Sequence, residues 1–429
     1  MERLKHVVTQ IAITPDCRLS ELPLLHRSLL PLLSLASSIY RFSLFLRRRL
    51  YFSGLVHQRR HDLISLSLSL SLSLFLKRYI LFPVVFRLPV PVISVGNLTW
   101  GGNGKTPMVE FIARLLDEAG IGPLILTRGY SGGDEAKMLH RHLLQTSARI
   151  GVGANRIATA ASMFERHGYV NSCDTLSEKL SSPYKSVSGP KDERIGVVIL
   201  DDGMQHWRVL HDVEIVMLNG LMPWGNNHLL PRGPLRESPS ALVRADIVVI
   251  HHADLVCVPD TQLRMIESTV HNIDATLPVF HSRMAPSHFF EVKNPHSRLS
   301  PRTVQNMVVL CVSAIGFPNA FAQAISKIGP LHVDRLDFSD HHLIQADDIE
   351  MITERLGRLK HEFNVEAIVV VTEKDYDRDP VILKQLCCLK VLVLCSSLQI
   401  MPLSAWTKEN FRMNLKKHLI DSLQEMNKK

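Results

Sequence analysis

The chain has 429 residues, of which 46% are hydrophobic and 21% are charged, and this composition excludes an intrinsically disordered protein. Its net charge of +8 favours anionic partners, which on charge alone include nucleic acid, phosphorylated small molecules and anionic lipid. The seven cysteines have no C-x-x-C spacing, which argues against a disulfide framework and a structural zinc site and favours a reducing compartment.

Residues 1–60 are predicted to associate with a membrane or to act as a targeting segment. The uncharged run from Ser28 to Tyr40 lies between Arg27 and Arg41. It is too short to span a bilayer, which takes about 20 apolar residues, and it suits a helix in the membrane interface with the arginines at anionic headgroups. A helix packed on the folded domain has the same periodicity, and the Arg- and Ser-rich, acid-poor composition also fits a targeting sequence.

Residues 61–86 are predicted to be a low-complexity insert. Their strict alternation of Ser and Leu has the period of a strand, but so repetitive a pattern cannot fix a register. Because a TC dinucleotide repeat is translated as alternating Ser and Leu, we hypothesise that the segment is retained intronic sequence.

From Val92 onward the sequence has the pattern of an α/β protein, with a short buried strand, a Gly-rich loop and a helix predicted from Pro107 to Ala119. The loop ends as a phosphate-binding loop does, but Thr99 stands where the general pattern has its first Gly. Loop N–H groups at a helix N-terminus bind phosphate, the lysine adds positive charge and the threonine is placed to bind Mg²⁺. The predicted nucleotide-binding residues are Gly101, Gly102, Asn103, Gly104, Lys105, Thr106 and Pro107.

A second predicted strand supplies the carboxylates that a metal requires. Four apolar residues, Val197 to Leu200, precede Asp201 and Asp202, which therefore stand at the carboxyl end of a buried strand. This is a Walker B pattern, and together with Thr106 it predicts a nucleotide–magnesium site. Acidic residues at strand ends also commonly cap the next helix.

Six motifs in order, VGNLTWGGNGKTP, TRGYSGGDE, LDDGMQH, LLPRGPLRE, FSDHH and TEKD, resemble those of the tetraacyldisaccharide 4'-kinase family. The resemblance covers about Pro89 to Arg378. The loop of that family reads G-N-[LIV]-[ST]-x-G-G-x-G-K-T, so Thr99 fits the family although it departs from the general pattern.

The resemblance implies transfer of the ATP γ-phosphate, with Mg²⁺, to the 4'-hydroxyl of an acylated glucosamine disaccharide phosphate. It implies a membrane surface as a partner, and neither nucleic acid nor a protein partner. The basic N-terminus resembles plant versions, which implies a mitochondrion, with the cytoplasmic face of a bacterial inner membrane as the alternative.

The resemblance also implies roles for individual residues. Asp134 would be the base toward the sugar hydroxyl, supported by His341, and Asp201 and Asp202 would orient Mg²⁺. A histidine in such a loop is otherwise commonly a capping or solvated residue, and Arg236 beside Glu237 is commonly a surface ion pair. Candidates for substrate contact are Arg128, Tyr130, Glu135, Gln205 and Arg236.

The expected architecture is a P-loop NTPase-like parallel sheet domain over residues 91–278, a linker over 279–307 and a smaller α/β domain over 308–429. An N-terminal membrane-associating helix precedes them. His341 lies in the second domain, so the active site is expected in a cleft that domain closure completes. A P-loop ATPase or GTPase acting as an assembly or metal-centre chaperone, and a membrane-attached module without activity, remain as alternatives.

Overall fold

The computed structural model describes residues 2–52, 58–60, 85–129, 133–171, 173–181, 193–256, 259–386, 389–402 and 407–428. Most of the predicted insert, residues 61–84, and the predicted substrate residue Tyr130 lie outside the described residues.

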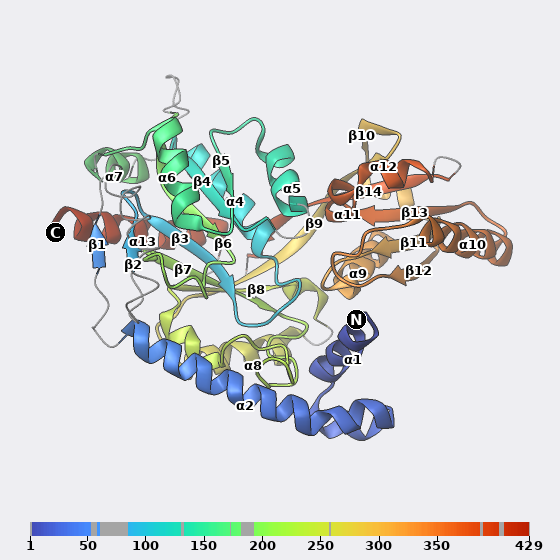
Figure 1. The fold of residues 1–429 in the computed structure, drawn as a ribbon. Coiled ribbons are helices and arrows are strands. Elements are labelled where there is room, and N and C mark those ends of the chain that lie inside the picture. Colours follow the sequence, from blue (N-terminus) through green and yellow to red (C-terminus); the bar gives the residue numbers. More distant parts are fainter. Residues whose placement is uncertain are drawn as a thin grey trace.

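The described chain forms a twelve-stranded mixed sheet with helices on both faces (Figure 1), which confirms the α/β class. The strands are β1 (Gln58–Arg60), β2 (Val85–Arg87), β3 (Val92–Asn97), β4 (Gly122–Thr127), β5 (Arg149–Val152), β6 (Ile195–Asp201), β7 (Val213–Asn219), β8 (Ile247–His251), β9 (Val279–Glu291), β10 (Asn294–Leu299), β11 (Val308–Ser313), β12 (His332–Asp337), β13 (Ala367–Thr372) and β14 (Val391–Ile400). The helices are α1 (Glu2–Ile13), α2 (Leu24–Phe52), α4 (Lys105–Glu118), α5 (Asp134–Leu143), α6 (Arg156–His167), α7 (Cys173–Ser181), α8 (Pro259–His271), α9 (Pro318–Ile328), α10 (Ala346–Phe363), α11 (Glu373–Arg378), α12 (Pro380–Lys384) and α13 (Lys408–Lys428). Strands β1 and β2 pair separately.

The strand order of the large sheet is β12-β11-β13-β14-β9-β8-β7-β3-β6-β4-β5, and β10 pairs with β9 outside this order. The strands of each lobe are parallel to one another, and the two parallel sets meet where β9 and β14 pair antiparallel. In the first lobe, residues 91–278, strands β3, β4, β6, β7 and β8 are buried along their whole length, in agreement with their largely apolar sequences. In the second lobe, residues 308–402, α10 and α9 pack on opposite faces of β11 and β13.

The two lobes join through β9 and β14, and this corrects the expectation that residues 279–307 form a linker. Strand β9 pairs parallel with β8 through residues 279–282 and antiparallel with β14 through residues 282–291. The middle of β9 is only partly buried, with Arg283 and Ser287 exposed, and Pro286 sits where the register shifts, so the sequence lacks the regular apolar alternation of a strand.

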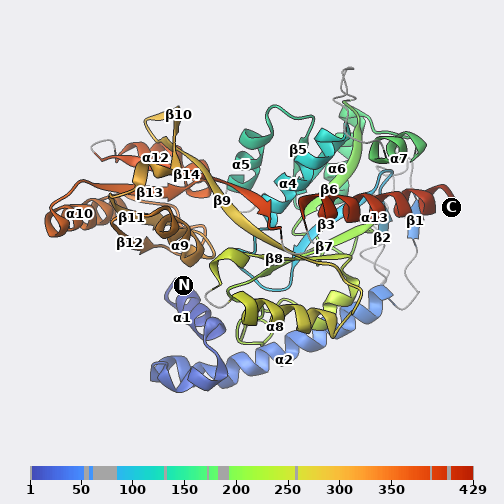
Figure 2. The same cartoon turned by 180° about the vertical axis from the view of Figure 1, so that it is seen from behind.

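Helix α13 lies on the first lobe, although the sequence analysis predicts that residues 308–429 belong to the second domain. Figure 2 shows it running along the first lobe, on the side of the molecule seen from behind. Phe411, Leu415 and Leu419 belong to the same buried cluster as β3 and α4. The ring of Phe411 meets those of Phe111 and Phe280 edge to face, with centroids 5.7 and 5.2 Å apart.

Helix α2 runs beneath α8 along one edge of the first lobe (Figures 1 and 2) and is held by side-chain hydrogen bonds. Ser37 Oγ donates to Leu229 O at 2.8 Å, and Tyr40 Oη donates to Arg236 O at 2.9 Å. In the part of the chain that the structure describes, α2 is the one helix long and apolar enough to cross a membrane by length and composition. The uncharged run from Ser28 to Tyr40 lies within this helix, which continues past Arg41 to Phe52.

A charged cluster clamps α4 and α5 of the first lobe to α11 of the second. His142 lies between Glu110 and Glu373, with 2.7 Å from Nδ1 and from Nε2 to the respective carboxylate oxygens. Although burial alone would lower it, the hydrogen bonds with Glu110 and Glu373 raise the pKa of His142 to about 9. Burial alone would raise the pKa of Glu373, but His142 and Arg141 lower it to about 2.

Truncation of Phe411 tests the placement of α13. Phe411 is 0% exposed, so Phe411→Ala should cost about 3–5 kcal/mol of unfolding free energy through lost burial and a residual cavity. The matched control is Met413→Ala, because Met413 in the same helix is 60% exposed. Denaturant unfolding that shows equal, small losses for both variants would contradict the packing of α13 on the first lobe.

The His142 cluster predicts a pH dependence of stability. Because the folded-state pKa of His142 is about 9, above the unfolded value of about 6.5, its contribution is complete below pH 6.5 and is lost as pH rises through 9. The thermal unfolding midpoint should therefore fall more between pH 7 and pH 10 in the wild type than in His142→Gln. Equal slopes would show that the cluster adds no proton-linked stability, and His361→Gln on the exposed surface serves as the control.

Candidate functional site

The Gly-rich loop has the geometry of a phosphate cradle. It connects the buried strand β3 to α4, which begins at Lys105, two residues earlier than expected. Gly101 and Gly104 have φ of 87° and 77°, which favours glycine, and a Cβ on Gly104 would lie 2.5 Å from the His251 ring. The helix N-terminus therefore points its free N–H groups into the loop.

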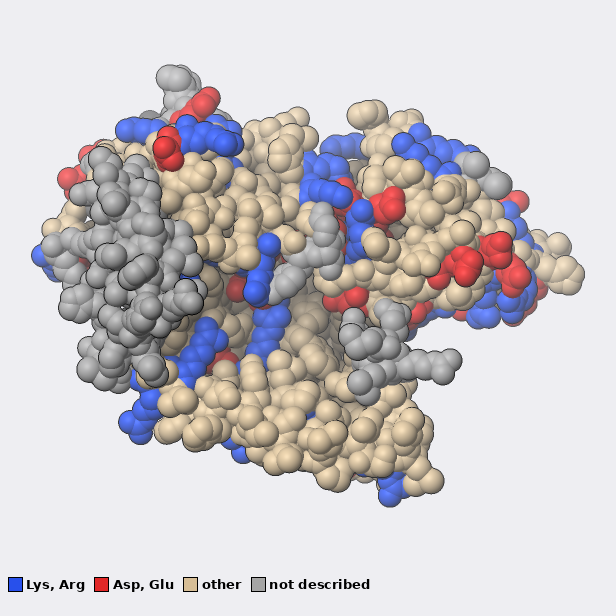
Figure 3. Space-filling view, viewed as in Figure 1, with Lys and Arg blue, Asp and Glu red and all other residues tan. Residues whose placement is uncertain are grey.

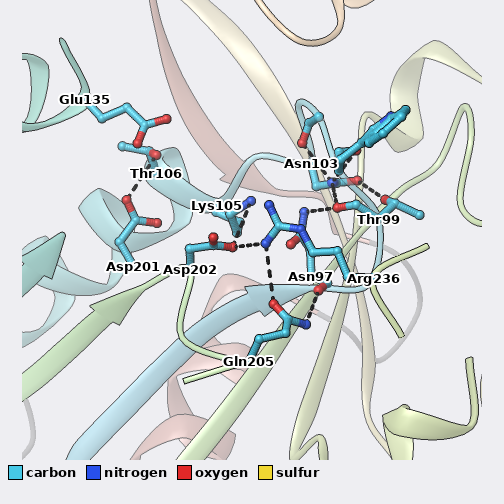
Figure 4. Close-up of polar contacts among 12 residues, drawn as sticks. Asn97, Thr99, Asn103, Lys105, Thr106, Glu135, Asp201, Asp202, Gln205 and Arg236 are labelled. Atoms are coloured by element: carbon cyan, nitrogen blue, oxygen red, sulfur yellow. Dashed lines mark hydrogen bonds and ion pairs between the residues drawn. The ribbon is translucent and has the colours of Figure 1, made fainter. Parts of the chain in front are cut away.

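Thr99 takes the place of the usual glycine because it is part of a buried side-chain network (Figure 4). Its Oγ1 donates to Asn103 Oδ1 at 3.2 Å, and Asn103 Nδ2 donates to Gly101 O at 2.9 Å. Asn97 Nδ2 donates to Thr99 O at 2.6 Å. The backbone of Thr99 does not adopt a positive φ, so a side chain is tolerated there.

The two aspartates at the carboxyl end of β6 face different partners in Figure 4. Asp202 Oδ1 lies 3.4 Å from Lys105 Nζ and accepts a 2.6 Å hydrogen bond from Arg236. Burial alone would raise the pKa of Asp202, but Lys105 and Arg236 lower it. Asp201 is buried, and burial together with nearby Glu135 raises its pKa.

Asp201 and Thr106 offer oxygen ligands for a cation. Thr106 Oγ1 donates to Asp201 Oδ2 at 3.4 Å, while Asp201 Oδ1 is buried and has no hydrogen-bond partner among the described residues. A hydroxyl and one carboxylate are hard ligands that suit Mg²⁺ when phosphate oxygens and water complete the coordination. No cluster of three or more His, Cys, Asp or Glu residues with metal-site geometry occurs in the described ranges.

The two predicted catalytic residues meet across the lobes. His341 Nδ1 lies 3.4 Å from Asp134 Oδ2, within ion-pair range but without a hydrogen bond. His341 lines the cleft, whereas Asp134 is 1% exposed and lies behind it. Although burial alone would raise it, His341, Lys374 and Arg378 lower the pKa of Asp134.

The remaining predicted contact residues divide into two groups. Arg128, Glu135 and Arg236 line the cleft, and Glu135 pairs with Lys374 at 3.2 Å. Gln205 is instead used internally, since its Nε2 donates to Asn97 O at 3.0 Å and to Glu237 at 3.1 Å.

A cleft of about 360 Å³ lies between the lobes and is lined by the phosphate loop, Asp201 and Asp202 on one side and His341 on the other. The second lobe covers the loop directly, because a Cβ on Gly316 would lie 3.0 Å from Gly101 Cα and Gly102 N. Sequence reasoning missed this turn and also Lys374 and Arg378 of α11. The spacing of Asp375 and Arg378, three residues apart in TEKDYDR, was the available signal for a helical ion pair.

Comparison with known proteins agrees with the motif order. A family model described as tetraacyldisaccharide-1-P 4'-kinase matches residues 61–132 and 131–416. The chain is 49% identical over 419 residues to the "probable tetraacyldisaccharide 4'-kinase, mitochondrial" of Arabidopsis thaliana, and the match covers 98% of each chain. It is 33% identical over 296 residues to the tetraacyldisaccharide 4'-kinase of Syntrophus aciditrophicus, covering 67% of this chain and 75% of that one.

A solved structure shares the fold. The LpxK of Aquifex aeolicus in complex with ATP has a TM-score of 0.54 and 19% identity to this chain, and the match covers 92% of this chain and 100% of that one. Together, the family model and the relatives show that the chain belongs to the tetraacyldisaccharide 4'-kinase family.

Proposed function

We propose that the protein transfers the γ-phosphoryl group of ATP to the 4'-hydroxyl of a tetraacyldisaccharide 1-phosphate, a step of lipid A biosynthesis. The observation that carries this proposal is the cleft, in which the phosphate loop and Asp201 of one lobe face His341 of the other. The relative of known structure bound to ATP supports ATP as the donor. The name of the Arabidopsis relative includes the word mitochondrial, which supports the mitochondrion as the location of this protein.

The phosphate end of the nucleotide is assigned to the first lobe. Loop N–H groups from Gly101 to Thr106 and the Lys105 ammonium would bind the phosphates, for which Asp202 now competes at 3.4 Å from Lys105 Nζ. Thr106 and Asp201, with Asp202 close by, would hold Mg²⁺, which neutralises charge on the phosphates when bound.

The hydroxyl proton is assigned to the pair formed by His341 and Asp134. Because His341 Nδ1 faces Asp134, Nε2, which lies 3.8 Å from Asp340 Oδ2, is the nitrogen proposed to accept the proton from the sugar hydroxyl. The oxygen then attacks the γ-phosphorus, the bond to the bridging oxygen breaks and ADP leaves. Asp134 would stabilise the imidazolium, which reverses the roles expected from sequence, since Asp134 lies behind His341.

The membrane surface is assigned to the outer face of α2. Leu32, Leu35, Ile39, Phe42 and Leu46 follow helical spacing and are exposed. Figure 3 shows the lower edge of the molecule, where α2 lies, as largely free of charge with Lys and Arg toward its ends. An apolar face flanked by basic residues suits an interface with anionic headgroups, where an acylated substrate resides.

Phosphoryl transfer can be measured directly with purified protein, ATP, Mg²⁺ and tetraacyldisaccharide 1-phosphate in detergent micelles. We expect a bisphosphorylated product, and Lys105→Ala should lower kcat by about 10²–10³ because a charge that stabilises the transition state is lost. Lys360→Ala, a surface variant, should be unchanged. ATP hydrolysis that ignores the lipid, without transfer, would select the assembly-chaperone class instead.

Membrane contact through α2 predicts loss of vesicle binding on charge insertion. The double variant Ile39→Asp/Phe42→Asp should bind anionic phospholipid vesicles much more weakly, because two carboxylates would enter the apolar interface. Its ATP affinity should stay near that of the wild type. The control is Met351→Asp/Val381→Asp, which charges exposed apolar positions of the second lobe. Equal sedimentation of all three proteins with vesicles would leave α2 as a packed helix only.

A further inference from the structure

The carboxylate of Asp134 receives its side-chain hydrogen bonds from Arg378. Nε and Nη2 of Arg378 donate to Asp134 Oδ2 at 3.2 and 3.0 Å, whereas His341 Nδ1 stays at 3.4 Å from the same oxygen. The second oxygen, Oδ1, accepts from the Glu135 N–H at 2.9 Å. The side chains of Arg378 and Asp134 are 4% and 1% exposed, so water cannot replace either partner.

Arg378 is itself fixed by α11 and the turn after β11. Its Nη1 donates to Asp375 Oδ1 at 2.8 Å, and the same oxygen accepts from the Ala314 N–H at 3.1 Å. The Ala314 carbonyl in turn accepts from the His341 N–H at 3.2 Å. The contacts form a closed ring through Asp134, Arg378, Asp375, Ala314 and His341, so one guanidinium connects the carboxylate to the backbone that carries the imidazole.

Loss of Arg378 would leave a buried carboxylate without its hydrogen-bonded counter-charge. Three positive or protonatable groups face Asp134, namely His341, Lys374 and Arg378, and Lys374 is partly neutralised by Glu135. Because burial disfavours the ionised form, the pKa of Asp134 would rise once the guanidinium is gone. A neutral Asp134 could not stabilise an imidazolium at His341.

We propose that Arg378 is a positioning residue for phosphoryl transfer, which holds the Asp134 carboxylate toward His341 and ties both groups to the second lobe. The inference rests on the proposed kinase function. Arg378 touches neither the cleft nor the reacting atoms, so it acts through Asp134. Its guanidinium fork matters as well as its charge, because Nε and Nη2 bind Asp134 while Nη1 binds Asp375.

Steady-state kinetics of the full chain with ATP and the disaccharide substrate in micelles tests this role. Arg378→Gln should lower kcat by about 10²-fold, at the lower end of the range for acid–base groups, with little change in the KM for ATP. The acidic limb of the kcat profile should move to higher pH by about 1 unit, since a carboxyl with a raised pKa loses its proton later. Arg378→Lys should restore most of the pH profile and only part of kcat.

A double-variant cycle separates positioning from a purely structural role. In the Asp134→Asn background, where no carboxylate is left to orient, adding Arg378→Gln should cause almost no further loss of kcat. A further loss as large as that in the wild-type background would overturn the proposal, and so would an Arg378→Gln variant with an unshifted pH profile. The exposed variant Arg358→Gln controls for loss of one positive charge.

Folding and function are checked in the same series. Thermal unfolding identifies any variant that fails to fold. If Arg378→Gln does not fold, the kinetics of Arg378→Lys test the proposal instead. An unchanged kcat in Arg378→Lys would overturn the requirement for the guanidinium geometry. Wild-type protein runs alongside. A wild type that transfers no phosphoryl group refutes the proposed function itself, whereas an active wild type with unaffected Arg378 variants refutes only the role of Arg378.

Discussion

The antiparallel pairing of β9 with β14 is the contact on which the candidate site depends. Strand β8 of the first lobe pairs with the start of β9. Strand β13 of the second lobe pairs with the start of β14. The start of β14 lies opposite the far end of β9, because β9 and β14 are antiparallel. The second lobe is therefore displaced beyond the carboxyl ends of the first-lobe strands, and its own strands run in the opposite direction. Both sets of carboxyl ends face one another, so ligand-binding loops from two parallel sheets meet in one cleft.

Charged groups rather than apolar surface join the lobes next to that cleft. Helix α11 supplies Glu373, Lys374 and Arg378, which pair with His142, Glu135 and Asp134 of the first lobe. Buried ion pairs add little net stability over apolar contacts, but breaking one partner is costly, so such contacts favour a single relative position of the lobes. The geometry that the proposed chemistry needs is thus specified by the same residues that dock the lobes.

The N-terminal helix reaches the site through the loops beside the phosphate cradle. Tyr40 binds the carbonyl of Arg236, and Arg47 donates to the carbonyl of Gln205 at 2.9 Å. Arg236 in turn pairs with Asp202, next to Lys105. A helix suited to the membrane interface is therefore anchored to residues one contact away from the nucleotide site, which suits an acceptor whose acyl chains stay in the membrane while its sugar enters the cleft.

The sequence by itself determined the local parts. The strand, Gly-rich loop and helix around Lys105, and the acidic pair Asp201 and Asp202 at the carboxyl end of β6, follow from periodicity and residue chemistry within short windows. The motif order also predicted that Asp134 and His341 would meet. Only the tertiary structure decided that β9 is a bridging strand, that α13 packs on the first lobe, and that Arg378 holds Asp134. These depend on contacts between residues far apart in the chain, where burial and charge pairing override local pattern.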